Sequence, residues 1–564
     1  MTSWLRERLG TRTAAAIAGG PSWAYVLGWV LLFFIVMEAV TGAALAAFYS
    51  PSTTAAWASV AYIQDQAALG WLVRGLHFHG GGAIAIVAGL HLLQTAVYGA
   101  YKKPRELTWW LGLLLMVLLL AWAITGYVLR WDQAGYWANK VELGIAAGAP
   151  IIGGLIRAAA LGGNDYGNLT LTRFYDLHVV VLPAIVTLGI AGHIWLAKRH
   201  GTTPRRETTS AATPRWPAQT LRDTFAMAVA FAILLGYTIS QHGADLAGPA
   251  DPSQAFDARP LWYFRWLFLL RELAGSAEKL VAMVVPAVLG AILVALPLAD
   301  RGADRDVRKR LAFVGTVFGL FAIVGALTVV SVITDGNDEK HAAALEKSGK
   351  LAQRARDLAV QYGVPVTGAL DVYKTPPMWA ARTLYEQRCK SCHDATSKDR
   401  KGPIIGPGHG DRAWLRGMVL GPSTEPYWGK TKLAKTEGAM KPVDLKDAGL
   451  AELVEFLYAE SGATDVDAAK RTKGEGTFDS ACNDCHTRDE GSSNNSPALA
   501  GLGSRAYYLD FISNPKSALH MGKDKSEMPR FDRELSLVDR DAIAGYLVWL
   551  RTATQKDLDA LGPL

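Results

Sequence analysis

Long apolar runs separated by short polar segments fill the first 333 residues of the chain. Seven runs approach the roughly 20 residues that a helix needs to cross the hydrocarbon layer of a membrane. They lie at about residues 25–48, 75–99, 108–130, 174–198, 220–240, 276–299 and 309–333. Beyond them the sequence is mixed and charged. The pattern predicts an all-α protein in which a membrane bundle of seven transmembrane helices precedes a water-soluble part.

The soluble part divides into a linker and two similar modules. Residues 336–377 are rich in alanine and charge, and they predict a solvated spacer that is helical in its first half. Residues 378–461 and 462–564 each hold a Cys-x-x-Cys-His motif, then a loop, a methionine and an amphipathic closing helix. The repetition predicts an internal duplication into two small α-helical domains.

The distribution of charge gives the direction of the chain through the membrane. The formal net charge is +7, and the basic residues cluster beside the apolar runs, which indicates membrane topology and no nucleic-acid partner. These residues are Arg6, Arg8, Arg12, Lys102, Lys103, Arg105, Lys198, Arg199, Arg205, Arg206, Arg215, Arg301, Arg305, Arg308, Lys309 and Arg310. Because cytoplasmic loops carry the excess of Lys and Arg, we expect a cytoplasmic N-terminus in a bacterial inner membrane and a periplasmic soluble part.

All four cysteines of the chain lie in the motifs CKSCH (389–393) and CNDCH (482–486). They are Cys389, Cys392, Cys482 and Cys485. The CxxCH motif is typical of covalent haem c attachment, in which the adjacent histidine binds iron. A zinc site can have the same cysteine spacing, and a structural disulfide is the remaining alternative. The histidine in both copies and the expected periplasmic location favour two covalent c haems.

Each c haem needs a second axial ligand, which is usually a methionine downstream of the motif. Met440 and Met528 precede prolines in GAMKPV and SEMPRF, as expected for rigid loops that present sulfur to iron. Met418 and Met521 are the competing residues. The predicted pairs are His393 with Met440 and His486 with Met528.

Four histidines lie inside the apolar runs in two evenly spaced pairs. His77 and His91 are 14 residues apart, and His178 and His193 are 15 apart. Fourteen residues are close to four helical turns, so both members of a pair share one helix face about 21 Å apart. Imidazole is costly in hydrocarbon unless it has a partner. Two such helices predict two stacked His/His sites for non-covalent haem; the alternative is four unrelated polar residues that face the bundle interior.

Glycines repeat at the same interval on two other runs. Gly28 and Gly42 are 14 residues apart in the first run, and so are Gly112 and Gly126 in the third. Glycine lets a porphyrin approach the helix backbone closely. Ordinary small-residue helix packing is the alternative, but the shared interval favours haem packing.

Residues 20–200 resemble the four-helix dihaem core of cytochrome b from quinol-oxidising cytochrome bc and bf complexes. The strings that carry the resemblance are RGLHFHGG, KKPRELTW, TGYVLRWDQAGYWA, PIIGG, LTRFYDLHVVVLP and GHIW. KKPRELTW and the 15-residue histidine spacing are similar to the chloroplast-type branch. Residues 216–333 resemble the remaining three helices. The resemblance implies a four-helix domain at 1–215 and a three-helix domain at 216–335, fused here to a C-terminal dihaem class I cytochrome c.

The resemblance also implies a ligand set for each b haem. The ligands near the periplasmic side would be His77 and His178, and those near the cytoplasmic side would be His91 and His193. Arg74 and Arg173 would contact haem propionates.

In the family, quinol is oxidised where the end of the third span meets the short helices after it and a Pro-Glu-Trp-Tyr motif. The matching segments are 127–136, 150–154 and Pro260-Leu261-Trp262-Tyr263. Leu261 stands where the family's glutamate is thought to accept a quinol proton, and leucine cannot relay one. The candidate residues of this site are Tyr127, Asp132, Asp257, Pro260, Trp262, Tyr263 and Glu272.

The resemblance implies a subunit of a quinol:cytochrome c-type oxidoreductase. One quinol electron would go to a Rieske iron–sulfur partner and on to a periplasmic cytochrome or terminal oxidase, and the other would cross the membrane through two b haems, contributing to proton translocation. No Cys–His cluster remains in the sequence for a Rieske centre, and the family implies a homodimeric complex. Two alternatives stay open: a quinol dehydrogenase membrane anchor without bifurcation, and a haem conduit without quinone chemistry.

Overall fold

The computed structural model describes residues 16–17, 19–204, 213–398, 400–436, 439–488, 496–523 and 525–562. The chain divides into two compact units, Met1–Val372 and Tyr373–Leu564. Within the described residues the only sheet is a pair of two-residue antiparallel strands, β1 (Ala16–Ile17) and β2 (Thr213–Pro214). The all-α prediction is confirmed. Of the basic residues used to assign topology, those outside the described ranges are Arg6, Arg8, Arg12, Arg205 and Arg206.

Among the described residues, seven helices are long and apolar enough to cross a membrane, which confirms the predicted number. They are α2 (Leu27–Ala46), α4 (Gly70–Val97), α5 (Glu106–Val128), α9 (Leu182–His200), α10 (Ala218–Ser240), α12 (Glu278–Ala299) and α13 (Leu311–Asn337). α8 (Asn168–Asp176) and a π-helical turn at Leu177–Val181 run directly into α9. Large apolar side chains such as Val40, Leu188 and Ile233 are exposed, as expected for helices that face lipid.

The second span begins earlier than the apolar pattern predicts. α4 starts at Gly70, whereas the apolar run starts near residue 75 because Arg74 interrupts it. The Arg74 guanidinium donates hydrogen bonds to the carbonyl oxygens of Ala244 and Asp245, at 2.6 Å each. A charged group with such partners can be buried, so this arginine does not end the helix.

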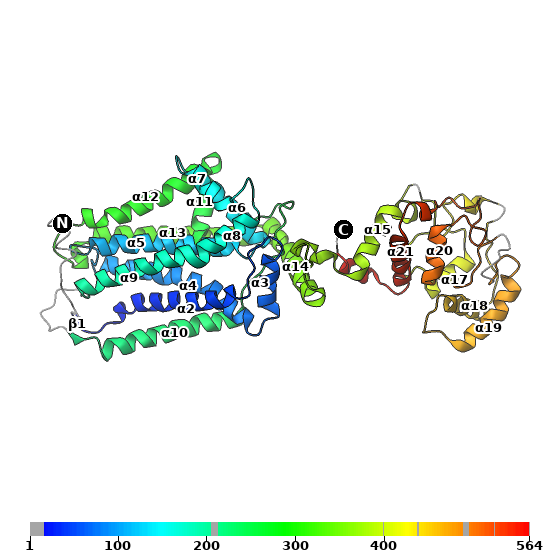
Figure 1. Cartoon of the computed structure of the whole chain (residues 1–564), viewed down its shortest axis with the longest axis horizontal. Helices are drawn as coiled ribbons and strands as arrows, with labels where there is room; N and C mark the ends of the chain where they lie inside the picture. Colours follow the sequence, from blue (N-terminus) through cyan, green and yellow to red (C-terminus); the bar gives the residue numbers. More distant parts are fainter. Residues whose placement is uncertain are drawn as a thin grey trace. The chain divides into compact units, whose positions relative to one another are not determined.

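The long helices of the first unit lie side by side with their axes in nearly the same direction (Figure 1). α2 packs along α4, and α5 packs along α9, which gives the four-helix core that the sequence predicts. One apolar cluster joins α2 and α4 to α10 through Phe34 and Leu234. A second cluster joins α4 and α5 to α12 and α13 through Trp109 and Val317.

Short helices gather at one end of this bundle, called the α6 end below. They are α3 (Ala56–Asp65), α6 (Gln133–Ala147), α7 (Gly153–Leu161) and α11 (Arg265–Ala274). α3, α6 and α7 share an apolar core in which Trp131 and Tyr136 are buried. The opposite end, called the Arg310 end, carries the basic residues Lys102, Arg105 and Arg310. One end of the bundle is therefore covered by short helices, and the other end carries this group of basic residues.

The predicted spacer contains a helix that belongs to the membrane unit. α14 (Glu339–Tyr362) buries Ala355, Leu358 and Ala359 and packs on α3. Arg356 binds the Asp65 carboxylate of α3, with Nε 2.8 Å from Oδ2. Residues 342–347 of this helix are exposed, as expected of a solvated spacer, whereas its later part packs on the membrane unit because alanine and leucine give it one apolar face.

The second unit is built from short helices around two separate cores. They are α15 (Pro377–Arg388), α16 (Lys390–His393), α17 (Arg412–Leu420), α18 (Asp447–Glu460), α19 (Ala468–Ala481), α20 (Arg505–Ser513), α21 (Leu537–Leu550) and α22 (Gln555–Ala560). α15 packs on α21, and α18 packs on α19. The sequence predicts modules at 378–461 and 462–564, but the packing crosses that boundary, because each closing helix covers the opening helix of the other module.

Candidate functional site

Two pairs of histidines face each other inside the four-helix core. The ring centroids of His77 and His178 are 6.1 Å apart, and those of His91 and His193 are 6.5 Å apart. A metal–imidazole bond is about 2.0 Å and the ring nitrogen lies roughly 1.2 Å from the centroid, so two imidazoles on one metal ion have centroids about 6.4 Å apart. Both pairs therefore have the separation that axial ligation of one iron requires.

Each of the four predicted glycines lies against one of these histidine rings. A Cβ added at Gly42 would come within 3.0 Å of the His77 ring, and one at Gly126 would come closer still to the His178 ring. The same relation holds for Gly28 with the ring of His91 and for Gly112 with the ring of His193. Each glycine therefore makes room for one imidazole against the helix backbone.

Hydrogen bonds fix the orientation of two of the rings. His77 Nδ1 lies 2.8 Å from Glu38 Oε2 and 3.1 Å from Thr41 Oγ1. His178 Nδ1 lies 3.1 Å from the carbonyl oxygen of Trp122. Such a partner on Nδ1 leaves Nε2 as the nitrogen for a metal. The sequence reasoning missed Glu38, although a lone acidic residue in the apolar run of α2 is the signal that marks it.

The two arginines expected at haem propionates bind backbone groups in this structure. Arg74 donates to Ala244 O and Asp245 O. Arg173 donates to the carbonyl oxygens of Ala158 and Ala159, at 2.8 Å each. Their contact with propionates stays a prediction.

The two CxxCH motifs have the same local geometry. His393 Nδ1 lies 2.8 Å from Pro403 O, and His486 Nδ1 lies 2.8 Å from Pro497 O. Burial lowers the pKa of both imidazoles, which favours the neutral form that binds metals. The four cysteines, Cys389, Cys392, Cys482 and Cys485, are free thiols. Free thiols are the form that thioether attachment to a porphyrin needs, and the disulfide alternative gains no support.

Each of the two predicted methionine ligands lies near the CxxCH motif of the other module. Met440 lines a pocket together with His486, and so does the competing Met521. Met528 packs on the core that holds Cys389. The predicted pairing of each histidine with the methionine of its own module disagrees with this packing, because the modules exchange their closing helices.

Aromatic side chains of the predicted quinol site meet at the α6 end. Trp262 Nε1 lies 3.2 Å from the position of a Cβ on Gly82 of α4. Tyr263 interacts electrostatically with Tyr127 at the end of α5. Arg130 lies over the Tyr127 ring, 4.2 Å from its centroid. Pro260 and Leu261 directly precede the short 3-10 helix Trp262–Phe264. The structure thus brings the Pro-Leu-Trp-Tyr segment to α4 and α5.

The acidic candidates differ in their partners. Asp132 is fully buried and accepts hydrogen bonds from two backbone N–H groups, at 2.7 and 3.0 Å. Asp257 forms ion pairs with Arg259 and His341. Glu272 is exposed on α11. Asp132 and Asp257 therefore hold structure together, and Glu272 faces solvent.

Glu142 of α6 is a partly buried acid that the sequence reasoning missed. Its Oε2 atom is buried and has no hydrogen-bond partner among the described residues. The carboxylate interacts electrostatically with Tyr263, Tyr127 and Tyr166. Burial raises the pKa of Glu142 to about 8. Only the fold brings it to the Pro-Leu-Trp-Tyr segment, which is distant in the chain.

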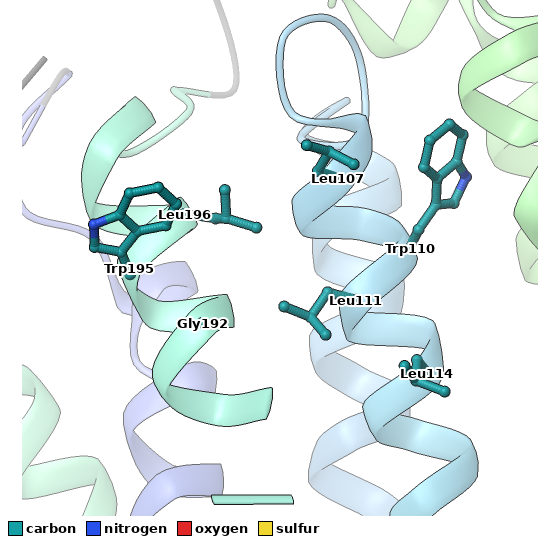
Figure 2. Close-up of a pocket in the computed structure, with 7 residues that line it drawn as sticks. All are labelled: Leu107, Trp110, Leu111, Leu114, Gly192, Trp195 and Leu196. Atoms are coloured by element: carbon teal, nitrogen blue, oxygen red, sulfur yellow. The ribbon is translucent and has the colours of Figure 1, made fainter. Parts of the chain in front are cut away.

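An open apolar groove lies between α5 and α9 near the Arg310 end (Figure 2). It is lined by Leu107, Trp110, Leu111, Leu114, Gly192, Trp195 and Leu196. Leu114 and Trp195 are about half exposed, so the groove belongs to the surface that faces lipid. Its lining residues carry no ionisable side chain, and we assign it no chemistry.

A membrane helical bundle with paired histidines, joined to a unit with two CxxCH motifs, defines a haem-binding electron-transfer protein of the membrane. The family model described as Cytochrome b/b6/petB matches residues 15–201, and the model described as Cytochrome b(C-terminal)/b6/petD matches residues 249–347. Cytochrome b6 of Mastigocladus laminosus is 35% identical over 204 residues, which are 35% of this chain and 95% of the relative. The chain belongs to the cytochrome b/b6 family.

Further comparisons extend this result. Cytochrome b6 of Rippkaea orientalis is 37% identical over 177 residues, which are 31% of this chain and 80% of the relative. In the second unit, residues 469–547 match the model described as Cytochrome C oxidase, cbb3-type, subunit III. A solved chain of a Hyperthermophilic respiratory Complex III aligns with a TM-score of 0.50 and 24% identity, covering 66% of this chain and all of that one. The last comparison supports the fold alone.

Proposed function

We propose that this chain is the cytochrome b and dihaem cytochrome c subunit of a quinol-oxidising complex in a bacterial inner membrane. The observation that carries the proposal is the pair of facing histidine sites, with ring centroids 6.1 and 6.5 Å apart, in a cytochrome b fold. The proposal includes two b haems, two covalent c haems, quinol as electron donor and a Rieske protein as partner, within a homodimeric complex. Bound haem supplies one-electron transfer at each of these sites.

Quinol oxidation needs a group that takes the hydroxyl proton. Leu261 cannot do so, and we assign this role to Glu142. Its unpartnered Oε2 atom and its proximity to Tyr263 support the assignment. Tyr263 and Tyr127 would orient the quinol through their hydroxyl groups, and Trp262 would close the site against α4.

The distribution of charge supports one orientation of the membrane unit. Lys102, Arg105 and Arg310 lie at the end opposite α6, and cytoplasmic loops carry the excess of basic residues. The Arg310 end would therefore face the cytoplasm, and the α6 end and the second unit would lie in the periplasm. Protons from quinol would then be released on the periplasmic side, and electrons would reach a periplasmic cytochrome or a terminal oxidase.

The direct test is the purified complex with its partners. We expect equal amounts of non-covalent b haem and covalent c haem, a co-purifying Rieske protein, and b-haem reduction by quinol that stops with an oxidation-site inhibitor. Quinol-driven reduction of the b haems that is insensitive to such an inhibitor would instead support a membrane anchor without bifurcation. Absence of any quinol-driven reduction would leave only the haem conduit.

A further inference from the structure

The helices of the second unit pair across the two sequence modules. In a compact haem c module, we expect the helix that precedes CxxCH to pack on the helix that follows the methionine loop. Here α15, which leads into the first motif, packs on α21 at the end of the second module. α19, which leads into the second motif, packs on α18 at the end of the first module. The opening and closing helices are therefore exchanged.

The first core contains residues from both ends of the unit. Its buried members include Tyr385 and Cys389 from the first motif region and Ile543 and Leu547 from α21. Met528 packs against the same core. The backbone also joins these segments, because Gly408 N donates to Leu550 O at 2.8 Å. The surroundings of the first CxxCH motif are thus completed by the last part of the chain.

The second core is made from the middle of the unit. It joins Leu453 and Phe456 of α18 to Phe478 of α19, and Cys482 packs against it. Met440 and His486 line one pocket beside this core. An ion pair stabilises the packing of these helices. Arg412 of α17 binds Glu455 of α18, and the Glu455 carboxylate also accepts a hydrogen bond from Asp467 N, just before α19, at 2.8 Å.

Met521 lines the pocket of His486 as well, so the two methionines must be compared. Met440 precedes Pro442 and the closing helix α18, just as Met528 precedes Pro529 and the closing helix α21. Met521 lies in the loop between α20 and Met528 and does not directly precede a closing helix. The parallel between the two closing segments favours Met440.

We propose that the two c-haem sites are an intramolecular domain swap, in which His393 is paired with Met528 and His486 is paired with Met440. The family model that spans residues 469–547 as one continuous domain is consistent with this origin. The sequence keeps the order of two tandem modules, while the fold exchanges their closing halves. The proposal concerns the second unit alone and does not depend on quinol chemistry.

The test uses the full-length, haem-loaded chain with one attachment motif removed. In the Cys482→Ser/Cys485→Ser background only the first motif holds haem. There we expect Met528→Ala to abolish the methionine-to-iron charge-transfer band of the ferric protein, and Met440→Ala to leave it intact. In the Cys389→Ser/Cys392→Ser background we expect the reverse. The opposite pattern would overturn the swap, and loss of the second band in Met521→Ala with retention in Met440→Ala would overturn the choice of Met440.

A second measurement avoids the removal of haem. Ile543→Ala opens the first core in the intact dihaem protein, so amide hydrogen exchange should become faster in α15 as well as α21. The same substitution should leave α18 and α19 unchanged. Faster exchange in α19 with unchanged α15 would show that the modules close within themselves and would refute the proposal.

Discussion

At the scale of single residues, the membrane unit is distinguished by two acidic side chains, one buried and one partly buried. Glu38 binds His77 Nδ1, and Glu142 lies beside Tyr263 without a hydrogen-bond partner for Oε2 among the described residues. Burying an acidic side chain in such surroundings costs free energy. Its presence there therefore indicates a function. Glu38 orients a predicted iron ligand, whereas Glu142 keeps an oxygen free to take a proton.

Replacing Glu142 tests its role as proton acceptor. We expect Glu142→Gln to slow quinol-driven reduction by about 10²- to 10⁴-fold, the range typical of a lost general base. Because the pKa of Glu142 is raised to about 8, the carboxyl is mostly protonated below that pH and cannot accept a proton. The rate of the unaltered protein should therefore rise as the pH rises through about 8, and the variant should lack this rise. Glu346→Gln, at an exposed position of α14, is the matched control. An unchanged rate and pH profile in Glu142→Gln would remove Glu142 from the mechanism.

Replacing one glycine tests the fit of the imidazoles. A Cβ at Gly126 would overlap the His178 ring, whereas one at Gly81 meets nothing within 4 Å. We expect Gly126→Ala to cost about 1–3 kcal/mol by overpacking and to lose about half of the b haem per covalent c haem in a haem assay. Gly81→Ala should keep the full b haem content. Equal haem content in both variants would show that the Gly126 contact is not needed.

The sequence could predict the histidines and glycines because their information is periodic and local. His77 and His91 share a helix face by spacing alone, and glycines at the same interval support it. Glu142 has no such signal. Its relation to Tyr263 depends on how α6 packs against α5 and α12, and the pattern of apolar positions in these segments does not contain that approach.

At the scale of elements, an ion cluster ties three segments together at the Arg310 end. The Asp300 carboxylate, just after α12, accepts from Lys102 Nζ at 2.6 Å, from Arg310 Nε at 2.7 Å and from Tyr101 Oη at 2.6 Å. Lys102 precedes α5, and Arg310 precedes α13. The cluster therefore fixes the end of α12 against its two neighbours, beside the apolar core that contains Tyr101.

Removing the carboxylate at this place should destabilise the unit. Asp300→Asn leaves two buried cations without their counter-ion, which typically costs about 3–5 kcal/mol; we expect a clearly lower unfolding temperature in detergent. Asp304→Asn removes a half-exposed partner of Lys309 and should lower the unfolding temperature much less, because solvent screens that pair. A similar small loss in both variants would contradict the structural role of Asp300.

The pH dependence of this cluster has a definite sign. Burial raises the pKa of Asp300, but hydrogen bonds from Arg310, Lys102 and Tyr101 outweigh it and hold the pKa below its ordinary value. The stabilisation is thus present at and above the ordinary pKa of aspartate and is lost as the pH falls through the lowered value. Neutral and mildly acidic conditions should leave the cluster intact.

α14 shows why element contacts were harder to predict than elements. Its helical pattern was clear from the sequence, yet its high charge suggested a solvated spacer. The apolar face of Ala355, Leu358 and Ala359 is narrow, and the ion pair of Arg356 with Asp65 joins segments that are far apart in the chain. Composition averages over the helix and hides both features.

At the scale of the whole molecule, the odd number of spans among the described residues places the segments before α2 and after α13 on opposite sides of the membrane. A reporter phosphatase that is active only outside the cytoplasm measures this. We expect activity from a fusion after Tyr362 and none from a fusion after Gly201, which follows the fourth span. Activity from the Gly201 fusion would reverse the proposed orientation.

The order of modules was visible in the sequence, but their exchange was not. Two CxxCH motifs with similar flanking helices predict two domains, and nothing in either repeat distinguishes its own closing helix from that of its neighbour. Leu453 and Ile543 are equally suited to an apolar core. The connecting loops determine which opening helix α18 or α21 covers. The pattern of apolar positions contains no information about the geometry of these loops.

The packing of α15 on α21 also sets an order for biosynthesis. The chain leaves the ribosome from its N-terminal end, so the first CxxCH motif is made well before the helix that covers it. The core around α18 and α19 is continuous in the chain and can close while synthesis proceeds. The CxxCH motif that is synthesised first is therefore the last to be enclosed. A chain that ends prematurely, before α21, would leave the first motif exposed and the second motif covered.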